Sequence, residues 1–351
     1  MTENANPADE ARKNLDNLRF KISTLQDSAS LKSTIDEFTD LSSKAENFSN
    51  RIEFLRQRKY AYNGLLEKTA EDIANRWKLK AGSIDSQIKF QSATLQSSLR
   101  SIEIRLNSQG AIPPFTQVQM MTAEVDTFDD RCSSVQQTIE TMYGNIKNEI
   151  ETFSQQLSDL EYSLDKAEGA SFGFLPGETV VKAVKAVWCR NGKEEKSDPK
   201  GVLFITYQRM IFEQNEEVVT KKVFFVTTET QIIQKLLFEV PAVSVASVEG
   251  SKQGLFKNQD MLHLDFASGF FAREATLHLF DQPAEDWQKL VIQVKNHEID
   301  SIRVFAIDTN AVEKAKTAPA QCPYCGGAIT KPVLRGMDSI SCDFCGKFIR
   351  L

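Results

Sequence analysis

The chain has 351 residues, of which 41% are hydrophobic and 26% are charged, and its formal net charge is −6. The length predicts two or three domains, and the composition is that of a globular chain rather than a disordered or collagen-like one. This acidic balance is not that of a general nucleic-acid binder, and no apolar run approaches the roughly 18 residues that cross a bilayer.

Residues 1–8 are polar and acidic, which predicts a disordered N-terminus and not a signal peptide. Residues 9–168 predict long helices. In the last of them, apolar residues recur at alternating steps of four and three, as in a coiled coil, with one stutter-like shift at Ile146. This stripe comprises Met121, Val125, Phe128, Cys132, Val135, Ile139, Met142, Ile146, Ile150, Phe153, Leu157, Leu160 and Leu164.

Two similar stripes lie upstream. One comprises Ile35, Phe38, Leu41, Ala45, Phe48, Ile52 and Leu55, and the other Ile84, Ile88, Leu95, Leu99, Ile102 and Leu106. Turn residues at Asn63-Gly64 and the pair Pro113-Pro114 interrupt the helical pattern. The region therefore predicts three antiparallel helices, at about 9–61, 65–107 and 116–168. An intramolecular bundle and an intermolecular coiled coil would bury the same stripes, so a homo-oligomer formed through this arm stays open.

Charge differs between these helices. Residues 51–105 carry 11 basic and 6 acidic side chains, whereas residues 106–168 carry 3 basic and 11 acidic ones. A hairpin between them would place complementary flanks side by side. Alternatively, the charges only solvate the helices, or a basic stretch faces anionic lipid, which would resemble membrane-scaffolding bundles such as BAR domains. That stretch comprises Arg51, Arg56, Arg58, Lys59, Arg76, Lys78 and Lys80.

Residues 170–305 change to short apolar runs separated by turns, which predict strands. The expected strands are 180–188, 202–206, 210–212, 223–226, 236–240, 243–248, 261–266 and 274–280. Residues 284–297 then carry Trp287, Leu290, Val291 and Val294 at helical spacing. Many strands followed by one helix predict a small barrel closed by a C-terminal helix.

Three stretches of this region resemble GRAM domains of the pleckstrin-homology (PH) superfamily. They are Leu175-Pro-Gly-Glu178, Gly201–Phe212, which looks like the signature hairpin, and Val240–Val248. The resemblance covers about 130 residues and implies a PH-like fold that binds membrane lipids or proteins and does no catalysis.

Several loop residues of this domain are candidate contacts to a membrane or a partner. Arg190 and Lys193 lie in the first hairpin loop, where acidic neighbours offset the basic charge. Phe270 and Phe271, followed by Arg273, are adjacent, and two adjacent aromatic residues cannot both face one side of a sheet. Leu255, Phe256 and Lys257 raise the same expectation.

The C-terminus carries two Cys-x-x-Cys-Gly motifs, with Cys322 and Cys325 in the first and Cys342 and Cys345 in the second. Their spacing predicts one structural Zn²⁺ held by four thiolates, and residues 321–351 resemble a zinc ribbon. Two disulfides or a redox pair are weaker readings, because the first needs an oxidising compartment and the second a βαβ unit. Residues 306–320, small and polar, predict a flexible linker.

The remaining cysteines, Cys132 and Cys189, lie far apart and predict buried free thiols, which favours a cytoplasmic protein. His263, His278 and His297 are isolated, and no phosphate-binding loop is present. We therefore expect a multidomain α plus β, non-enzymatic cytoplasmic adaptor with protein partners, able to associate with membranes and without a small-molecule substrate. Two alternatives remain: a nucleic-acid or transcription-associated zinc-ribbon factor, and a structural component of a larger assembly or filament.

Overall fold

The computed structural model describes residues 7–109, 114–223, 226–254, 256, 258–267 and 273–351. The chain forms two compact units. One comprises Met1–Asn50 and Glu67–Gln155, and the other Arg51–Leu66 and Gln156–Leu351. Within the described residues, no helix has an apolar stretch long enough to cross a bilayer.

The N-terminal half contains four helices: α1 (Pro7–Ser30), α2 (Lys32–Gln57), α3 (Leu66–Asn107) and α4 (Phe115–Glu168). The interruptions predicted near Asn63 and Pro114 separate α2 from α3 and α3 from α4. The single helix predicted over 9–61 is wrong, because it is divided at Leu31. Of the N-terminus predicted to be disordered, residues 1–6 lie outside the described residues, and α1 begins at Pro7.

The division at Leu31 has a packing cause. Leu31 adopts a left-handed φ of 55° and is completely buried. Ala29 is also completely buried, and two residues two positions apart in a continuous helix would point about 200° apart. The left-handed residue turns the chain so that both side chains reach the core. It also shifts the stripe that follows, since Thr34 is buried and Ile35, predicted to be buried, is 39% exposed.

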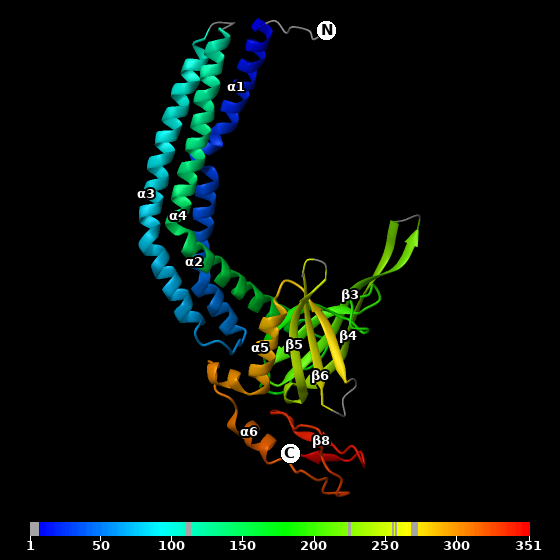
Figure 1. Ribbon diagram of the computed structural model, residues 1–351. Helices are drawn as coiled ribbons and strands as arrows, with labels where there is room; N and C mark the ends of the chain where they lie inside the picture. The colour runs from blue at the N-terminus through cyan, green and yellow to red at the C-terminus, as the bar shows by residue number, and fades with distance from the viewer. Residues whose placement is uncertain (1–6, 110–113, 224–225, 255, 257, 268–272) are drawn as a thin grey trace. The chain divides into compact units, whose positions relative to one another are not determined.

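In the first unit, ion pairs give the directions of the helices. Arg76 and Arg105 of α3 pair with Glu149 and Glu124 of α4, respectively. From the first pair to the second, the residue number rises along α3 and falls along α4, so the two helices are antiparallel. Figure 1 shows them side by side. Lys21 of α1 pairs with Asp126 at 2.7 Å. Complementary charge between the basic and acidic helices is thus present in the structure.

The core of the first unit consists largely of the predicted stripes, including all six residues named for α3. Two predicted members of the α4 stripe, Val135 and Met142, are only half-buried. Tyr143 is completely buried instead and lies edge-on to Trp77, with ring centroids 6.3 Å apart. The shift occurs where the heptad spacing changes, so one residue of the seam is replaced by its neighbour.

Most of the basic stretch considered for lipid binding is engaged within the protein. In the second unit, Arg51 pairs with Glu161 at 2.7 Å, and Arg58 with Asp165 at 2.7 Å and Glu168 at 2.9 Å. Arg56 donates to the carbonyl oxygens of Tyr60 and Tyr62. Arg76 is also paired, so four of the seven residues have partners within the protein, and lipid binding by the rest of the stretch stays a prediction.

The second unit contains a seven-stranded antiparallel sheet in the order β4-β3-β2-β1-β7-β6-β5. The strands are β1 (Val180–Trp188), β2 (Lys200–Thr206), β3 (Arg209–Val223), β4 (Val226–Pro241), β5 (Val245–Gln253), β6 (Gln259–Phe266) and β7 (Glu274–Leu279). The separate strand predicted at 223–226 is wrong, because Val223 ends β3 and Val226 begins β4; residues 224–225 lie outside the described residues. The described pairings leave β4 and β5 at the two edges, so closure into a barrel stays a prediction.

The predicted closing helix is confirmed as α5 (Ala284–Lys295). It buries Ala284, Trp287, Val291 and Val294. Gly250 on β5 permits the close approach of this helix, because a Cβ atom there would come within 2.4 Å of the Ala284 carbonyl oxygen. We call β1–β7 with α5 the β-domain; Figure 1 shows α5 beside β5.

After α5 come a 3-10 helix, η3 (Glu298–Ile302), and then α6 (Thr309–Lys316), β8 (Ser339–Ser341) and β9 (Phe348–Arg350). Part of the segment predicted to be a flexible linker is thus the helix α6, whose first turn is capped by the Asp308 side chain. We call residues 321–351 the ribbon.

Candidate metal centre

The four C-terminal cysteines lie together on two turns of the same build. Gly326 N–H donates to the Cys322 carbonyl oxygen at 2.8 Å, and Gly346 N–H donates to that of Cys342 at 2.9 Å. Both glycines have a left-handed φ, of 71° and 70°, which glycine adopts at no steric cost. The β8–β9 pair, in which Ile340 lies opposite Ile349, flanks the second turn, and a bridge between Gln321 and Ala328 flanks the first.

The thiol geometry fits a tetrahedral metal ion. All four sulfur atoms lie within 4.8 Å of one another. The Sγ atoms of Cys322 and Cys345 are 3.7 Å apart, and those of Cys325 and Cys342 are 3.6 Å apart. Four thiolates about 2.3 Å from a central Zn²⁺ would lie about 3.8 Å from one another. The cysteines can therefore hold one metal ion of this kind without rearrangement.

The pKa values of two of these thiols are shifted in opposite directions by their surroundings. The backbone N–H groups of Cys345 and Phe344 stabilise the Cys342 thiolate and lower its pKa to about 7. The Gly327 N–H lowers the pKa of Cys325, but the neighbouring thiols outweigh it and raise that pKa to about 12. Four thiolates this close repel one another, so full ionisation needs a cation among them.

The apolar core of the ribbon is small. Cys322, Cys342 and Ile349 are buried together, with Ile329 and Ile340 packed against them. A segment of this size buries too little apolar surface to fold independently. Metal–thiolate bonds would supply the missing stability.

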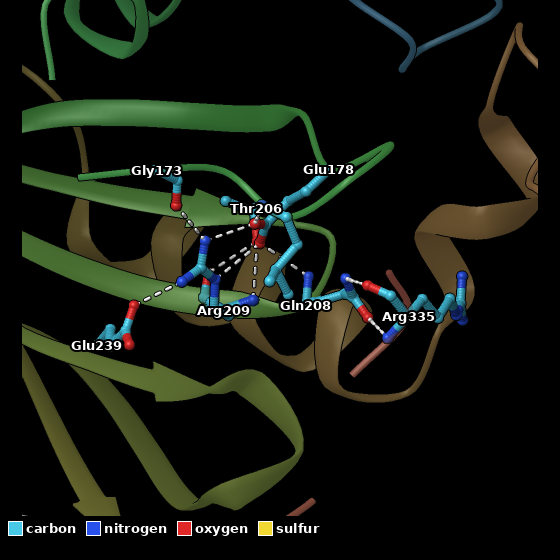
Figure 2. A network of polar contacts seen from close by, with 8 residues as sticks. Gly173, Glu178, Thr206, Gln208, Arg209, Glu239 and Arg335 are labelled. Atoms are coloured by element: carbon cyan, nitrogen blue, oxygen red, sulfur yellow. Dashed lines mark hydrogen bonds and ion pairs between the residues drawn. The ribbon is translucent and has the colours of Figure 1, made fainter. Parts of the chain in front are cut away.

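The ribbon is fastened to the β2–β3 turn of the β-domain, as Figure 2 shows. The Gln208 side-chain amide donates to the Arg335 carbonyl oxygen at 2.9 Å and accepts from the Arg335 N–H at 2.5 Å. The Arg335 guanidinium group pairs with Asp300 at 2.7 Å and lies 5.5 Å from the Tyr207 ring. Next to it, a Cβ atom on Gly336 would come within 2.5 Å of the Pro176 carbonyl oxygen.

Behind this turn lies a buried ion pair that joins two of the stretches used for the GRAM resemblance. Arg209 donates to Glu178 from Nε at 3.0 Å and from Nη2 at 2.5 Å (Figure 2). The Thr206 hydroxyl donates to the same carboxylate at 2.6 Å. Burial alone would lower the pKa of Arg209, but its hydrogen bonds and its attraction to Glu178, and then to Glu239, raise it.

A groove of about 480 Å³ lies between the end of β4 and the ribbon. Its apolar lining includes Pro241, Leu334, Met337, Ile340 and Phe348. Phe348 is 74% exposed, so the groove can accept an apolar side chain.

The structure does not bring the predicted membrane or partner contacts together into one site. Arg190 and Lys193 are exposed in the loop after β1, where the Arg190 guanidinium lies 5.7 Å from the Trp188 ring. Phe256 is 96% exposed and Arg273 is exposed. The remaining four, Phe270, Phe271, Leu255 and Lys257, lie outside the described residues.

The histidines are less isolated than their sequence positions indicate. His278 Nδ1 lies 2.6 Å from Glu194, and His297 Nδ1 lies 3.1 Å from the Arg335 guanidinium. His263 Nε2 lies 3.5 Å from Asp265 and 4.0 Å from Glu274. Cross-strand pairing brings the last group together, and the sequence carried no local signal for it.

No protein-family model matches the chain, and no curated protein matches it. Among solved structures, the chain is similar to the N-terminal PH domain of Vps36, at 16% identity and a TM-score of 0.25, over 36% of this chain and 85% of that chain. It is also similar to the linker-DH/PH domains of p115-RhoGEF, at 9% identity and a TM-score of 0.23, over 81% and 98%. The DH/PH domains of PDZ-RhoGEF, in complex with GTP-γ-S-activated RhoA, match at 9% identity and a TM-score of 0.23, over 78% and 94%. TM-scores of this size do not establish a shared fold, so the description of the β-domain rests on its own strands and helix.

Proposed function

We propose that this protein is a non-enzymatic adaptor, with a helical arm for partner binding and a GRAM- or PH-like β-domain that docks to a membrane or a protein. The ribbon would bind one structural Zn²⁺ through Cys322, Cys325, Cys342 and Cys345. The observation that carries this proposal is the closed thiol cluster on a ribbon that is fastened to the β-domain. Four thiolates complete a tetrahedron and leave no position for a substrate.

The polar groups around the cluster support a structural role. Arg335 and Gln208 hold the ribbon, and Arg209 and Glu178 hold the turn that bears Gln208. Each group is thus used in a contact between parts of the protein. The zinc ion, when bound, would cross-link the two ribbon turns and keep the Arg335 loop in place.

Exposed loop residues of the β-domain support docking at its surface. Phe256 is almost fully exposed in the β5–β6 connection, and Arg273 precedes β7. These two connections lie at opposite ends of β6, so each residue marks a separate candidate contact. An exposed apolar side chain and an exposed basic one each suit either a lipid headgroup region or a protein partner. The compartment that we propose is the cytoplasm, with membrane association where the ligand is lipid.

A nucleic-acid-binding ribbon is the second candidate. Tyr324, Phe344 and Phe348 are 59%, 70% and 74% exposed, which suits stacking with bases. However, Lys331 pairs with Asp343 and Arg335 with Asp300. This leaves fewer basic side chains for phosphates than the sequence alone indicates, so we rank this function below docking.

Flotation with vesicles tests the docking proposal. We would compare phosphatidylcholine vesicles with vesicles that also contain phosphatidylserine, at low and physiological salt, for the wild type, for Phe256→Ser and for Arg273→Glu. If the β-domain docks to lipid through either connection, the corresponding variant floats less than the wild type, whereas Ile292→Ser and Lys289→Glu, at exposed positions of α5, serve as controls.

Flotation that is unchanged in both variants would exclude both connections as the lipid contact. An absence of flotation under all conditions would assign the β-domain to protein recognition. A protein that instead binds single-stranded DNA or RNA with strong salt dependence would favour the nucleic-acid candidate.

A further inference from the structure

The outer face of α3 carries a line of exposed apolar side chains. Leu79, Phe90 and Ile104 are 84%, 64% and 61% exposed. At about 100° per residue, the three project within about 40° of one another. Opposite them, α3 buries Ile84, Ile88, Leu95 and Leu99 in the first unit, so the line points away from the core of that unit.

The charge around this line is one-sided. Residues 75–105 carry six basic side chains and two acidic ones, in a chain whose net charge is −6. By the same helical rotation, all six basic residues project within about 100° of the apolar line, whereas Asp85 and Glu103 project about 120° from it. The basic residues are Arg76, Lys78, Lys80, Lys89, Arg100 and Arg105.

Part of this positive charge is not neutralised within the protein. Arg76 and Arg105 pair with α4, and Lys89 pairs with Asp85 at 2.7 Å. Lys80 donates to a carbonyl oxygen, that of Met142, at 3.4 Å. The described contacts give Lys78 and Arg100 no acidic partner. Long basic side chains at these angles can extend toward the plane of the apolar line.

Three serine residues between the apolar ones have hydroxyl groups that are bonded within the helix. The Ser83 hydroxyl donates to the Lys80 carbonyl oxygen at 2.8 Å, Ser86 to that of Gly82 at 2.8 Å, and Ser101 to that of Ser97 at 3.0 Å. These hydroxyl protons are already bonded inside the helix. If this face left bulk water, few hydrogen-bond donors would therefore lose a partner.

We propose that this face of α3 binds an anionic membrane surface, with Leu79, Phe90 and Ile104 entering the headgroup region. The positive charge is complementary to anionic lipid. The apolar side chains are 11 and 14 residues apart, or about 16 and 21 Å along the helix. A partner helix would need anchors every three or four residues, and a protein hot spot would gather them at one centre. A lipid surface accepts anchors that are this dispersed.

This surface is separate from the β-domain loops, so it goes beyond the docking proposed above. The test is flotation of the full-length protein with phosphatidylcholine vesicles, with and without phosphatidylserine. Phe90→Ser should weaken partitioning into the phosphatidylserine vesicles about fivefold or more. Lys78→Gln with Arg100→Gln should weaken it about fivefold for each residue replaced.

Two other exposed apolar residues of the same unit provide matched controls. Phe20 on α1 and Met120 on α4 are 72% and 75% exposed and lie outside the α3 line, so Phe20→Ser and Met120→Ser should float as the wild type does. Circular dichroism would confirm that each variant keeps its helices.

Three outcomes would overturn the proposal. The wild type would fail to float with phosphatidylserine vesicles at low salt, Phe90→Ser would float as well as the wild type, or flotation would depend only on Phe256 and Arg273. The last outcome would leave the proposed docking of the β-domain intact. Binding of an acidic protein by this face without any vesicle binding would also reject a lipid surface.

Discussion

Arg209 is a buried cation whose guanidinium group is bonded by two carboxylates and a carbonyl oxygen. Its side chain is 8% exposed, and that of Glu178 is completely buried. Glu178 also accepts from the Leu175 N–H at 2.8 Å and from Thr206. The pair therefore connects the segment before β1 to the β2–β3 turn, and this turn carries Gln208, which holds the ribbon.

Replacing Arg209 with Met should lower the free energy of unfolding of the second unit by about 3–5 kcal/mol, because the Glu178 carboxylate would remain buried without its partner. Urea unfolding followed by fluorescence would measure the change. Lys193→Met, at an exposed lysine of the same domain, is the control and should change stability by less than about 0.5 kcal/mol. A loss equally small for Arg209→Met would contradict the assigned role of the pair.

At the residue scale, the spacing of the four C-terminal cysteines predicted that they lie together, and the structure brings all four within reach of one metal ion. The sequence also distinguished them from Cys132 and Cys189, which are buried free thiols and whose pKa values burial raises to about 11. The Glu178–Arg209 pair could not be predicted as a contact. Apolar alternation identifies strands, but it does not show which buried acidic residue pairs with which buried basic residue when the two are 31 positions apart in the sequence.

At the scale of elements, periodicity predicted α3 and α4 closely, because long stripes of buried side chains leave few alternatives. It missed the division at Leu31, which depends on a left-handed residue that brings two neighbouring apolar side chains into one core. It also divided the long β3–β4 hairpin incorrectly. The part of that hairpin that projects in Figure 1 contains the polar runs 213–217 and 227–231, which lack the alternation that marks a half-buried strand.

The attachment of the ribbon to the β-domain likewise could not be predicted from the sequence. The small, polar segment 306–320 predicted a tether, whereas the structure has α6 within it and fastens the Arg335 loop through Gln208 and Asp300. Backbone hydrogen bonds from a glutamine side chain leave no pattern in the sequence. The ribbon and the β2–β3 turn should therefore respond together to loss of the metal.

Removing zinc with a chelator should speed amide exchange at Arg335 and Met337 about tenfold or more, because the ribbon loses its cross-link and then its contacts to Gln208. The turn Tyr207–Arg209 should also exchange faster. Amides of Leu95 and Leu99 in α3 serve as internal controls and should not change. Faster exchange in the ribbon with an unchanged β2–β3 turn would show that the metal does not support this attachment.

At the scale of the whole chain, the helical arm covers its own apolar stripes. Within the first unit, α1–α4 bury them against one another in a single chain, as with the edge-to-face contact of Phe48 and Phe153 at 4.9 Å. Of the two arrangements that the sequence left open, the structure has the intramolecular bundle. A homo-oligomer formed through the arm stays a prediction.

The proposed adaptor function includes a zinc site that is structural and closed. The most direct measurement is X-ray absorption of the zinc-loaded full-length protein together with its metal content. We expect one zinc ion per chain with four sulfur ligands at about 2.3 Å and no nitrogen or oxygen ligand. A site with fewer sulfur atoms and an oxygen ligand in the remaining position would contradict it, because such a site is open to a substrate and would make the chain a candidate metalloenzyme.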